Sequence, residues 1–309
     1  MLKSLLLAFL AIAFACSLYS DPALAQRVFV SAKGSDSNTC TAASPCRTFQ
    51  RAHDAVPANG EVDVLDPAGY GPLTINKAIS IQGHGFSGIS AASGDGVTIN
   101  ASAGDKVNLR GLLFEGAGTG GNAVIFNSGG SLNLQDSAIR NFATSGIFFQ
   151  PGASSQLNVS QTLISDLGDG AIAIAIEPSG SAAANVVLNH VELDGGQLGF
   201  FVLGSLTTGR IDATISDSVV SNYNRNGILG QSGKGATIVM VRNCSISSNA
   251  TGVASTGPPA VVRMTRSTIT ANGTGLAVAS SGSLISYGDN NVDGNTTTNG
   301  SPTNTIIYH

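Results

Sequence analysis

The chain alternates short apolar stretches with polar turns, and this pattern repeats along most of its length. In each repeat an apolar anchor is followed five residues later by a second apolar residue, and in most repeats by a glycine six or seven residues further on. Three apolar pieces per repeat, separated by Asn, Asp and Gly, predict three short strands joined by turns. The anchors recur every 23–29 residues and are Leu109, Leu134, Val159, Leu188, Ile215, Val241, Met264 and Tyr287.

Three strands in each repeat of this length are typical of a β-solenoid, in which equivalent positions of successive coils stack about 4.8 Å apart. Parallel crossovers are overwhelmingly right-handed, so we expect an all-β fold, a right-handed parallel β-helix. Strand alternation places Val107 and Leu109 in the core and Asn108 outside. A column of mostly small residues is also expected to point inward: Ser137, Thr162, Val191, Ser218, Cys244 and Ser267.

The chain divides into four expected segments. Residues 1–25 combine Lys3, an apolar run and the small-residue motif Ala23-Leu24-Ala25, which predicts a secretory signal peptide. Residues 26–60 are expected to form a strand and a capping helix over 44–56, with Ser44 as its N-cap. Residues 61–295 are the β-helix repeats, and 296–309 are a fraying C-terminal tail in which residues 305–308 can add a last strand.

Composition narrows the class of protein. The 309 residues are 42% hydrophobic and 11% charged, which favours a folded chain over a disordered one. A formal net charge of −4 gives no reason to expect a nucleic-acid partner, and no apolar run after the signal peptide is long enough to span a bilayer. The protein is therefore expected to be secreted or periplasmic.

Export also bears on the cysteines, because disulfides persist outside the cytosol. Cys40 and Cys46 are close in sequence with no His or further Cys pair nearby, so a local disulfide is favoured over a metal site. Cys244 falls in the inward column and is expected to be buried.

Residues 28–56, residues 60–85 and the repeats together resemble the exported bacterial right-handed parallel β-helix proteins of the pectate-lyase-like superfamily. The resemblance covers nearly all of residues 26–300 and implies the fold. The superfamily includes polysaccharide lyases, glycoside hydrolases, epimerases and adhesins, so it implies a carbohydrate-related role without fixing an activity.

The catalytic signatures of that superfamily are mostly missing. Of the polygalacturonase-like set only Gly83-His84-Gly85 matches, and it is interpreted as the end of a strand and a turn. No dense acidic cluster suggests bound calcium, so no metal or cofactor is expected. If the protein is an enzyme, the resemblance implies a polysaccharide lyase or a glycoside hydrolase.

The expected register brings some polar residues together. His190 and Asp217 should lie one coil apart, about 5 Å, and could serve as an acid/base pair. Asp166 and Asp169 could act as paired carboxylates in glycosidic cleavage. For both pairs the alternative is a solvated ladder of turn residues, because Asp and Asn tolerate the backbone geometry of tight turns.

Asn108, Asn133 and Asn158 form an outward column that could bond its own neighbours or bind sugar hydroxyls. Tyr223 and Tyr70 are the expected exposed aromatics for stacking on sugars. The sequence thus predicts association with a polysaccharide or another cell-envelope component, with processing of that polymer left open. The alternative is a non-catalytic surface, scaffold or adhesin-like β-helix that binds another macromolecule. Asn-x-Ser/Thr triplets, such as those at Asn249 and Asn272, are expected by chance in this composition.

Overall fold

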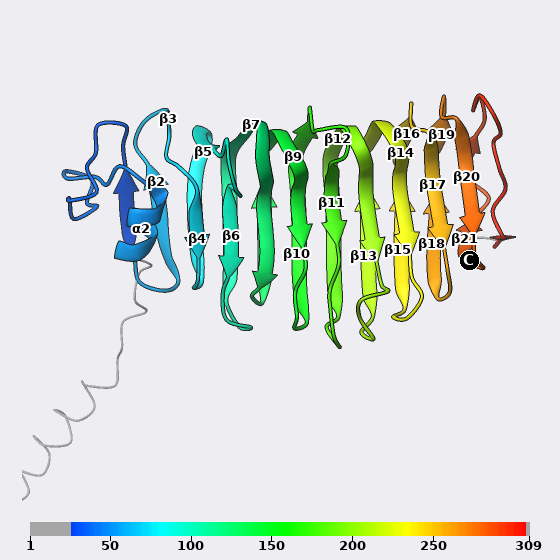
Figure 1. Cartoon of the computed structure of the whole chain (residues 1–309), viewed down its shortest axis with the longest axis horizontal. Coiled ribbons are helices and arrows are strands. Elements are labelled where there is room, and N and C mark those ends of the chain that lie inside the picture. Colours follow the sequence, from blue (N-terminus) through cyan, green and yellow to red (C-terminus); the bar gives the residue numbers. More distant parts are fainter. Residues whose placement is uncertain (1–25, 307–309) are drawn as a thin grey trace, which may run out of the picture.

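The structure is a computed structural model of the chain and describes residues 26–306; the predicted signal peptide lies outside the described residues. It is an elongated stack of parallel β-coils (Figure 1). The predicted all-β parallel solenoid is confirmed. The strands in the first half are β1 (Arg27–Val30), β2 (Gly60–Val64), β3 (Ala68–Gly69), β4 (Leu73–Ile75), β5 (Ile79–Ser90), β6 (Val97–Asn100), β7 (Lys106–Ser128), β8 (Ser131–Gln135), β9 (Ala138–Phe149), β10 (Ser155–Ser165) and β11 (Ile172–Ile176). Those in the second half are β12 (Ala184–Leu203), β13 (Ile211–Ser216), β14 (Val219–Gln231), β15 (Thr237–Arg242), β16 (Ser245–Ser247), β17 (Thr251–Thr256), β18 (Ala260–Thr265), β19 (Thr268–Thr270), β20 (Thr274–Ala279), β21 (Ser283–Ser286), β22 (Asn291–Val292) and β23 (Asn304–Thr305).

Every coil contributes to three faces. Face 1 consists of β1, β2, the starts of β5, β7, β10 and β12, and β8, β13, β15, β18, β21 and β23. Face 2 is made by short pieces such as β16, β19 and β22. Face 3 contains β4, β6, β11, β17, β20 and the ends of β7, β9, β12 and β14, and it lies toward the viewer in Figure 1.

A tight turn joins face 1 to face 2, and we call this turn corner 1. One residue in each later coil takes the left-handed backbone conformation there, with φ of 48–53° at Asp136, Gln161, His190, Asp217, Asn243 and Arg266. The residue that follows corner 1 points inward and forms the predicted column of small side chains, all of which are buried. Where this residue carries a hydroxyl or thiol, that group secures the turn: Ser218 Oγ accepts from the Val191 N–H and donates to the Ser216 carbonyl.

A second left-handed turn, corner 2, joins face 2 to face 3. It uses residues such as Asn141, Asp166 and Asn222. The residue after each of them turns into the core, which gives an inward column of Phe142, Leu167, Tyr223, Asn249 and Asn272. Asn249 and Asn272 are therefore buried structural residues and present no acceptor nitrogen for glycosylation in the folded chain.

The N-terminal segment differs from prediction in its helix. Helix α2 covers only Phe49–Ala55, and its N-cap is Thr48, whose side chain accepts from the Arg51 N–H. Ser44 instead closes a turn with Thr41. The expected start was wrong because the Cys40–Cys46 disulfide, which is present as predicted, holds this stretch in a loop.

The C-terminal tail is also more ordered than expected. Residues 296–299 hydrogen-bond to the backbone of residues 272–276, and β23 pairs with β21. The tail thus supplies backbone partners to the last strands of the stack. Uncovered strand edges are prone to pair with other chains, and this arrangement covers part of that edge.

Candidate functional site

An apolar band crosses the outer surface of face 3. In each coil the residues on either side of the band position, such as Ile147 and Phe149, fill the core, so the residue between them points outward. Backbone register aligns the outward residues from coil to coil in one row: Ile125, Phe148, Ala175, Phe201, Leu229, Ala254 and Ala277. Ile172, Leu198 and Leu203 extend the row sideways into a cluster separate from the main core.

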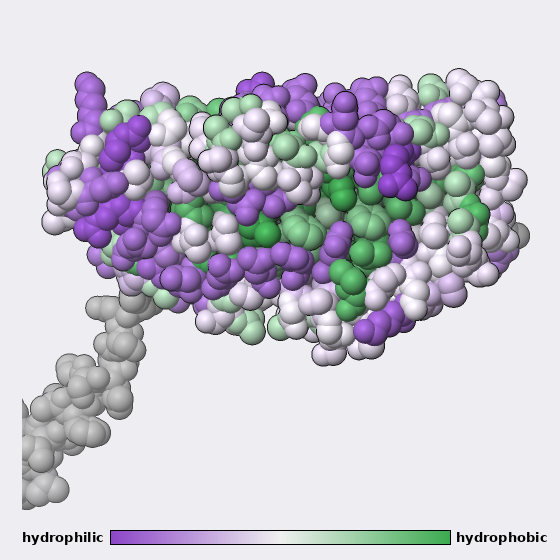
Figure 2. Space-filling view, viewed as in Figure 1, coloured by the Kyte–Doolittle hydropathy of each residue, from purple (hydrophilic) through white to green (hydrophobic). Residues whose placement is uncertain are grey.

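The band lies in a shallow trough. Its residues point away from the core, yet Ala175, Phe201 and Leu229 expose only 1%, 8% and 8% of their surface. Neighbouring side chains therefore stand above them. Figure 2 shows this side of the molecule, with the apolar band bordered by hydrophilic atoms above and below.

A row of amides runs beside the apolar band, one outward position further along each strand. Asn127 Nδ2 donates to Asn100 Oδ1 at 2.9 Å, and Gln150 Nε2 donates to Asn127 Oδ1 at 2.9 Å. Each amide has two donor hydrogens and two acceptor lone pairs. The bonds along the row use one hydrogen of Asn127 and Gln150, so further donors and acceptors remain for a ligand.

Glu177 continues the amide row in the next coil, because its N–H bonds to the Phe149 carbonyl just before Gln150. Its side chain is half-buried, and no hydrogen bond or ion pair of the carboxyl occurs within residues 26–306. Burial raises the pKa of Glu177 above its usual range. The carboxyl can thus accept hydrogen bonds when charged, or donate one when protonated.

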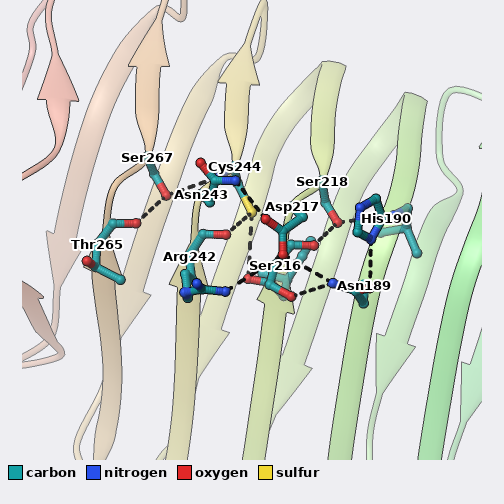
Figure 3. Close-up of polar contacts among 12 residues, drawn as sticks. Asn189, His190, Ser216, Asp217, Ser218, Arg242, Asn243, Cys244, Thr265 and Ser267 are labelled. Atoms are coloured by element: carbon teal, nitrogen blue, oxygen red, sulfur yellow. Dashed lines mark hydrogen bonds and ion pairs between the residues drawn. The ribbon is translucent and has the colours of Figure 1, made fainter.

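The predicted His190–Asp217 pair does not meet directly. His190 Nδ1 is 2.7 Å from Asn189 Oδ1, and Asn189 Nδ2 donates to Asp217 Oδ2 at 3.2 Å, so the asparagine bridges them (Figure 3). Asp217 also accepts from Asn243 at 2.6 Å and lies 3.8 Å from Arg242. The Asn243 hydrogen bond, with the Arg242 charge, lowers the pKa of Asp217.

His190 and Asp217 do line one shallow groove of about 370 Å³ with Glu192. Direct proton transfer between two groups requires hydrogen-bond reach. In this arrangement the histidine is coupled to the carboxylate only through Asn189, and the acid/base role of the pair stays a prediction.

The two aspartates of the second predicted pair have separate partners. Asp166 occupies corner 2 and bonds to Ser165, whereas Asp169 is exposed and its backbone carbonyl accepts from Asn224. The structure gives no contact between the Asp166 and Asp169 carboxylates within residues 26–306. A role for them in cleavage is untested.

The column of Asn108, Asn133 and Asn158 on face 1 is a bonded ladder. Asn133 donates to Asn108 and Asn158 donates to Asn133, both at 2.7 Å. The ladder ends at Val187, which takes the next register position. Unlike the row on face 3, this ladder is flanked on its own strands by polar outward residues such as Gln135 and Gln156. Sugar binding by this column also stays a prediction.

The expectation that Tyr70 and Tyr223 are exposed was wrong. Tyr70 is fully buried, packs on Phe49 with ring centroids 5.1 Å apart, and donates its hydroxyl to Asp66. Tyr223 exposes 1% because it occupies the inward position after corner 2. The aromatic residues available on the outside of face 3 are phenylalanines instead.

Sequence reasoning also missed a histidine–carboxylate pair. His84 Nε2 lies 2.5 Å from Asp63 Oδ1, in a cleft at the N-terminal end of face 1. The sequence signal for this pair was the length of the corner. The corner contains four residues, Gly83–Phe86, whereas the same corner of the next coil contains one residue.

Comparisons with known proteins bear on the fold. Neither a protein-family model nor a curated protein matches the chain. Among solved structures it is similar to pectate lyase Pel9A, with 14% identity, a TM-score of 0.54, and coverage of 91% of this chain and 80% of that one. A second match is the A-module of the Azotobacter vinelandii mannuronan C-5 epimerase AlgE6, with 13% identity, a TM-score of 0.46, and coverage of 84% and 93%.

The likeness to pectate lyase Pel9A shows a shared β-helix fold. Within residues 26–306, no group of three or more His, Cys, Asp or Glu side chains is placed to hold a metal ion. In the same range no helix has the length and apolar character needed to cross a bilayer.

Proposed function

We propose that the protein is exported and binds a polysaccharide along face 3, with the sugar chain lying across successive coils. The observation that carries the proposal is the pairing of an apolar band containing Phe148 and Phe201 with a parallel row of amides on the same face. Ligand sites for small molecules combine apolar and aromatic walls with a few placed polar groups. Here that combination repeats from coil to coil, which suits a repeating polymer.

Each part of the face has a distinct task in this proposal. The C–H surface of a sugar ring packs on the apolar band, which removes apolar area from water on both sides. The hydroxyls at the ring edge exchange hydrogen bonds with Asn127, Gln150 and Glu177. A hydroxyl both donates and accepts, so it can bond to a carboxamide at either atom.

Two further observations support the proposal. Pectate lyase Pel9A, which shares the fold, is named for action on a polysaccharide. The Cys40–Cys46 disulfide suits an oxidising compartment outside the cytosol, in agreement with the predicted signal peptide.

The proposal is binding without cleavage. Glycosidases use two carboxyl groups on opposite sides of the scissile bond. Among the described residues that form the band and the amide row, Glu177 is the one carboxyl. It is therefore assigned to hydrogen bonding.

A polysaccharide array scored both for retention of the protein and for new reducing or unsaturated ends tests this function. We expect retention on at least one polymer without new ends. Phe148→Ala and Asn127→Ala should each weaken binding about tenfold, the equivalent of about 1.4 kcal/mol.

The matched control is Asn133→Ala, which removes the middle amide of the corresponding row on face 1. It should leave binding unchanged. Loss of binding in Asn133→Ala alone would place the site on face 1. Release of new ends would show catalysis in place of simple binding. Absence of binding to every polymer would refute the proposal.

A further inference from the structure

The turn from face 1 to face 2 is enlarged in one coil near the N-terminus. Register aligns Gln82 with Arg110 and Ser87 with Leu112, so the four residues Gly83–Phe86 stand where the next coil has only Gly111. His84 and Gly85 both adopt positive φ, 57° and 80°. The enlarged turn thus places an imidazole beside the outer surface of face 1.

Gly111 makes room for this turn. A Cβ atom at Gly111 would lie 2.8 Å from both the His84 and the Gly85 amide nitrogens, closer than real side chains approach. Its φ of 64° is also one that glycine adopts without strain. The enlarged turn therefore depends on residues of two coils: the extra residues of its own coil and the glycine of the next coil.

The turn forms one wall of a cleft of about 610 Å³, the corner cleft, which is within the usual range for small-molecule sites. Three hydrogen-bonded side-chain pairs line it. Asp63 holds His84 at 2.5 Å, Arg27 Nε donates to Glu61 at 2.6 Å, and Arg110 Nε donates to Asp136 at 2.8 Å. Gln82 and the two glycines Gly85 and Gly111 complete the lining.

The pairs leave both donors and acceptors unused. A guanidinium has five N–H donors, and the contact of Arg110 with Asp136 uses the one on Nε. Asp136 accepts through Oδ2, so Oδ1 remains. His84 is held through Nε2, and within the described chain its Nδ1 makes no hydrogen bond.

Charge decides which ligand class fits these groups. Glu61, Asp63 and Asp136 carry three negative charges against two positive charges on Arg27 and Arg110. An anion entering the cleft would meet this excess of carboxylate, and a cation would meet two guanidiniums. A neutral hydroxyl group satisfies a donor and an acceptor at once without adding charge.

We propose that the corner cleft binds one neutral, hydroxyl-rich sugar unit, whose adjacent hydroxyls bridge the Arg110–Asp136 pair and reach His84. This site is on a different face from the apolar band and does not depend on polysaccharide binding at face 3. The His84–Asp63 contact fixes the orientation of the imidazole, so the ring is presented in one pose to the ligand.

The test titrates the full chain with neutral sugars (glucose, galactose, mannose and their disaccharides) and with the matching uronic acids, glucuronate and galacturonate. Binding is followed by NMR of the arginine Nε and histidine ring signals. We expect a neutral sugar to shift Arg110 and His84, with an affinity that is unchanged between low and high salt. Arg110→Gln and Asp136→Asn should each weaken binding at least tenfold.

Arg140→Gln removes an exposed arginine of face 2 and is the matched control, expected to have no effect. Thermal melting checks that all variants remain folded. Preferential, salt-sensitive binding of the uronic acids would make this an anion site and overturn the proposal, as would no shift with any sugar. If Asn127→Ala on face 3 abolishes the same signal changes, the cleft is not a separate site. If Asn127→Ala leaves them intact, the cleft is an independent sugar site, whether or not face 3 binds a polysaccharide.

Discussion

Replacing Asn272 by alanine should strongly destabilise the protein. Asn272 is fully buried in the column that follows corner 2. Its Oδ1 accepts from the backbone N–H and the side-chain amide of Asn249, and its Nδ2 donates to the Ile246 and Thr270 carbonyls and to Asn295. The variant leaves several buried polar groups without a partner.

The size of the loss in stability follows from the number of buried groups that lose their hydrogen-bond partners. Each buried donor or acceptor left unsatisfied costs about 1–3 kcal/mol, and the Asn249 N–H has no other acceptor after the change. Asn249 Nδ2 keeps its bond to the Val220 carbonyl and so loses less. Two effective losses place the decrease in the free energy of unfolding at about 2–6 kcal/mol.

Urea denaturation of the native chain and two variants measures this decrease. Asn133→Ala is the matched control, because it removes the middle amide of a ladder on the half-exposed surface of face 1, where the amide–amide bonds are 2.7 Å against 2.9 and 3.0 Å at Asn272. Water can replace its partners, so we expect about 1 kcal/mol. Equal effects of Asn272→Ala and Asn133→Ala would refute the reasoning that burial, and not the amide–amide bond itself, makes the inner column important.

Three other predictions concern ionisable groups. Because burial raises the pKa of Glu177, its charged form is disfavoured in the folded state, and stability should fall as pH rises from about 4.3 through the raised pKa. Glu177→Gln should remove this slope and raise the melting temperature at pH 7 more than at pH 4, as measured by thermal melting. For Asp217, NMR titration should find a pKa below the ordinary value, and Asn243→Ala should raise it by removing the largest cause of the lowering; an unchanged pKa in the variant would show that the hydrogen bond is not the cause. Burial raises the pKa of Cys244 to about 11, so its thiol should resist iodoacetamide at pH 8 until urea unfolds the chain; fast labelling of the native protein would contradict its inward position.

The coils could be predicted because their signal is repeated. An inward residue such as Ser218 is fixed by period-two alternation and by the anchor spacing, and each coil tests the same register again. The Cys40–Cys46 disulfide could be predicted for a different reason, since six residues of separation and an expected oxidising compartment leave few other pairings.

The same reasoning failed at the corners between the faces. Whether Tyr223 points in or out depends on which neighbour takes the left-handed conformation, and a sequence of turn-forming residues on both sides of Tyr223 does not reveal that. His84 was missed because a three-residue insertion changes the direction of the side chain, which requires the path of the backbone. The register predicted that His190 and Asp217 occupy equivalent corner positions in successive coils. It could not predict that the Asn189 side chain lies between them, because this side chain follows no repeated pattern.

The apolar band was missed for yet another reason. Phe148 and Phe201 lie in continuous apolar stretches, GIFF and GFFV, that are equally compatible with burial on both sides of a strand. Only the structure shows that the central residue of each stretch belongs to a cluster outside the main core.

Hydroxyl-radical footprinting of the protein with the polysaccharide selected by the array tests the central claim most directly. Binding along face 3 predicts that oxidation of Phe148 and Leu203 falls when the polymer is added, while oxidation of Val187, exposed on face 1, is unchanged. Protection of Val187 with no change at Phe148 and Leu203 would contradict the account.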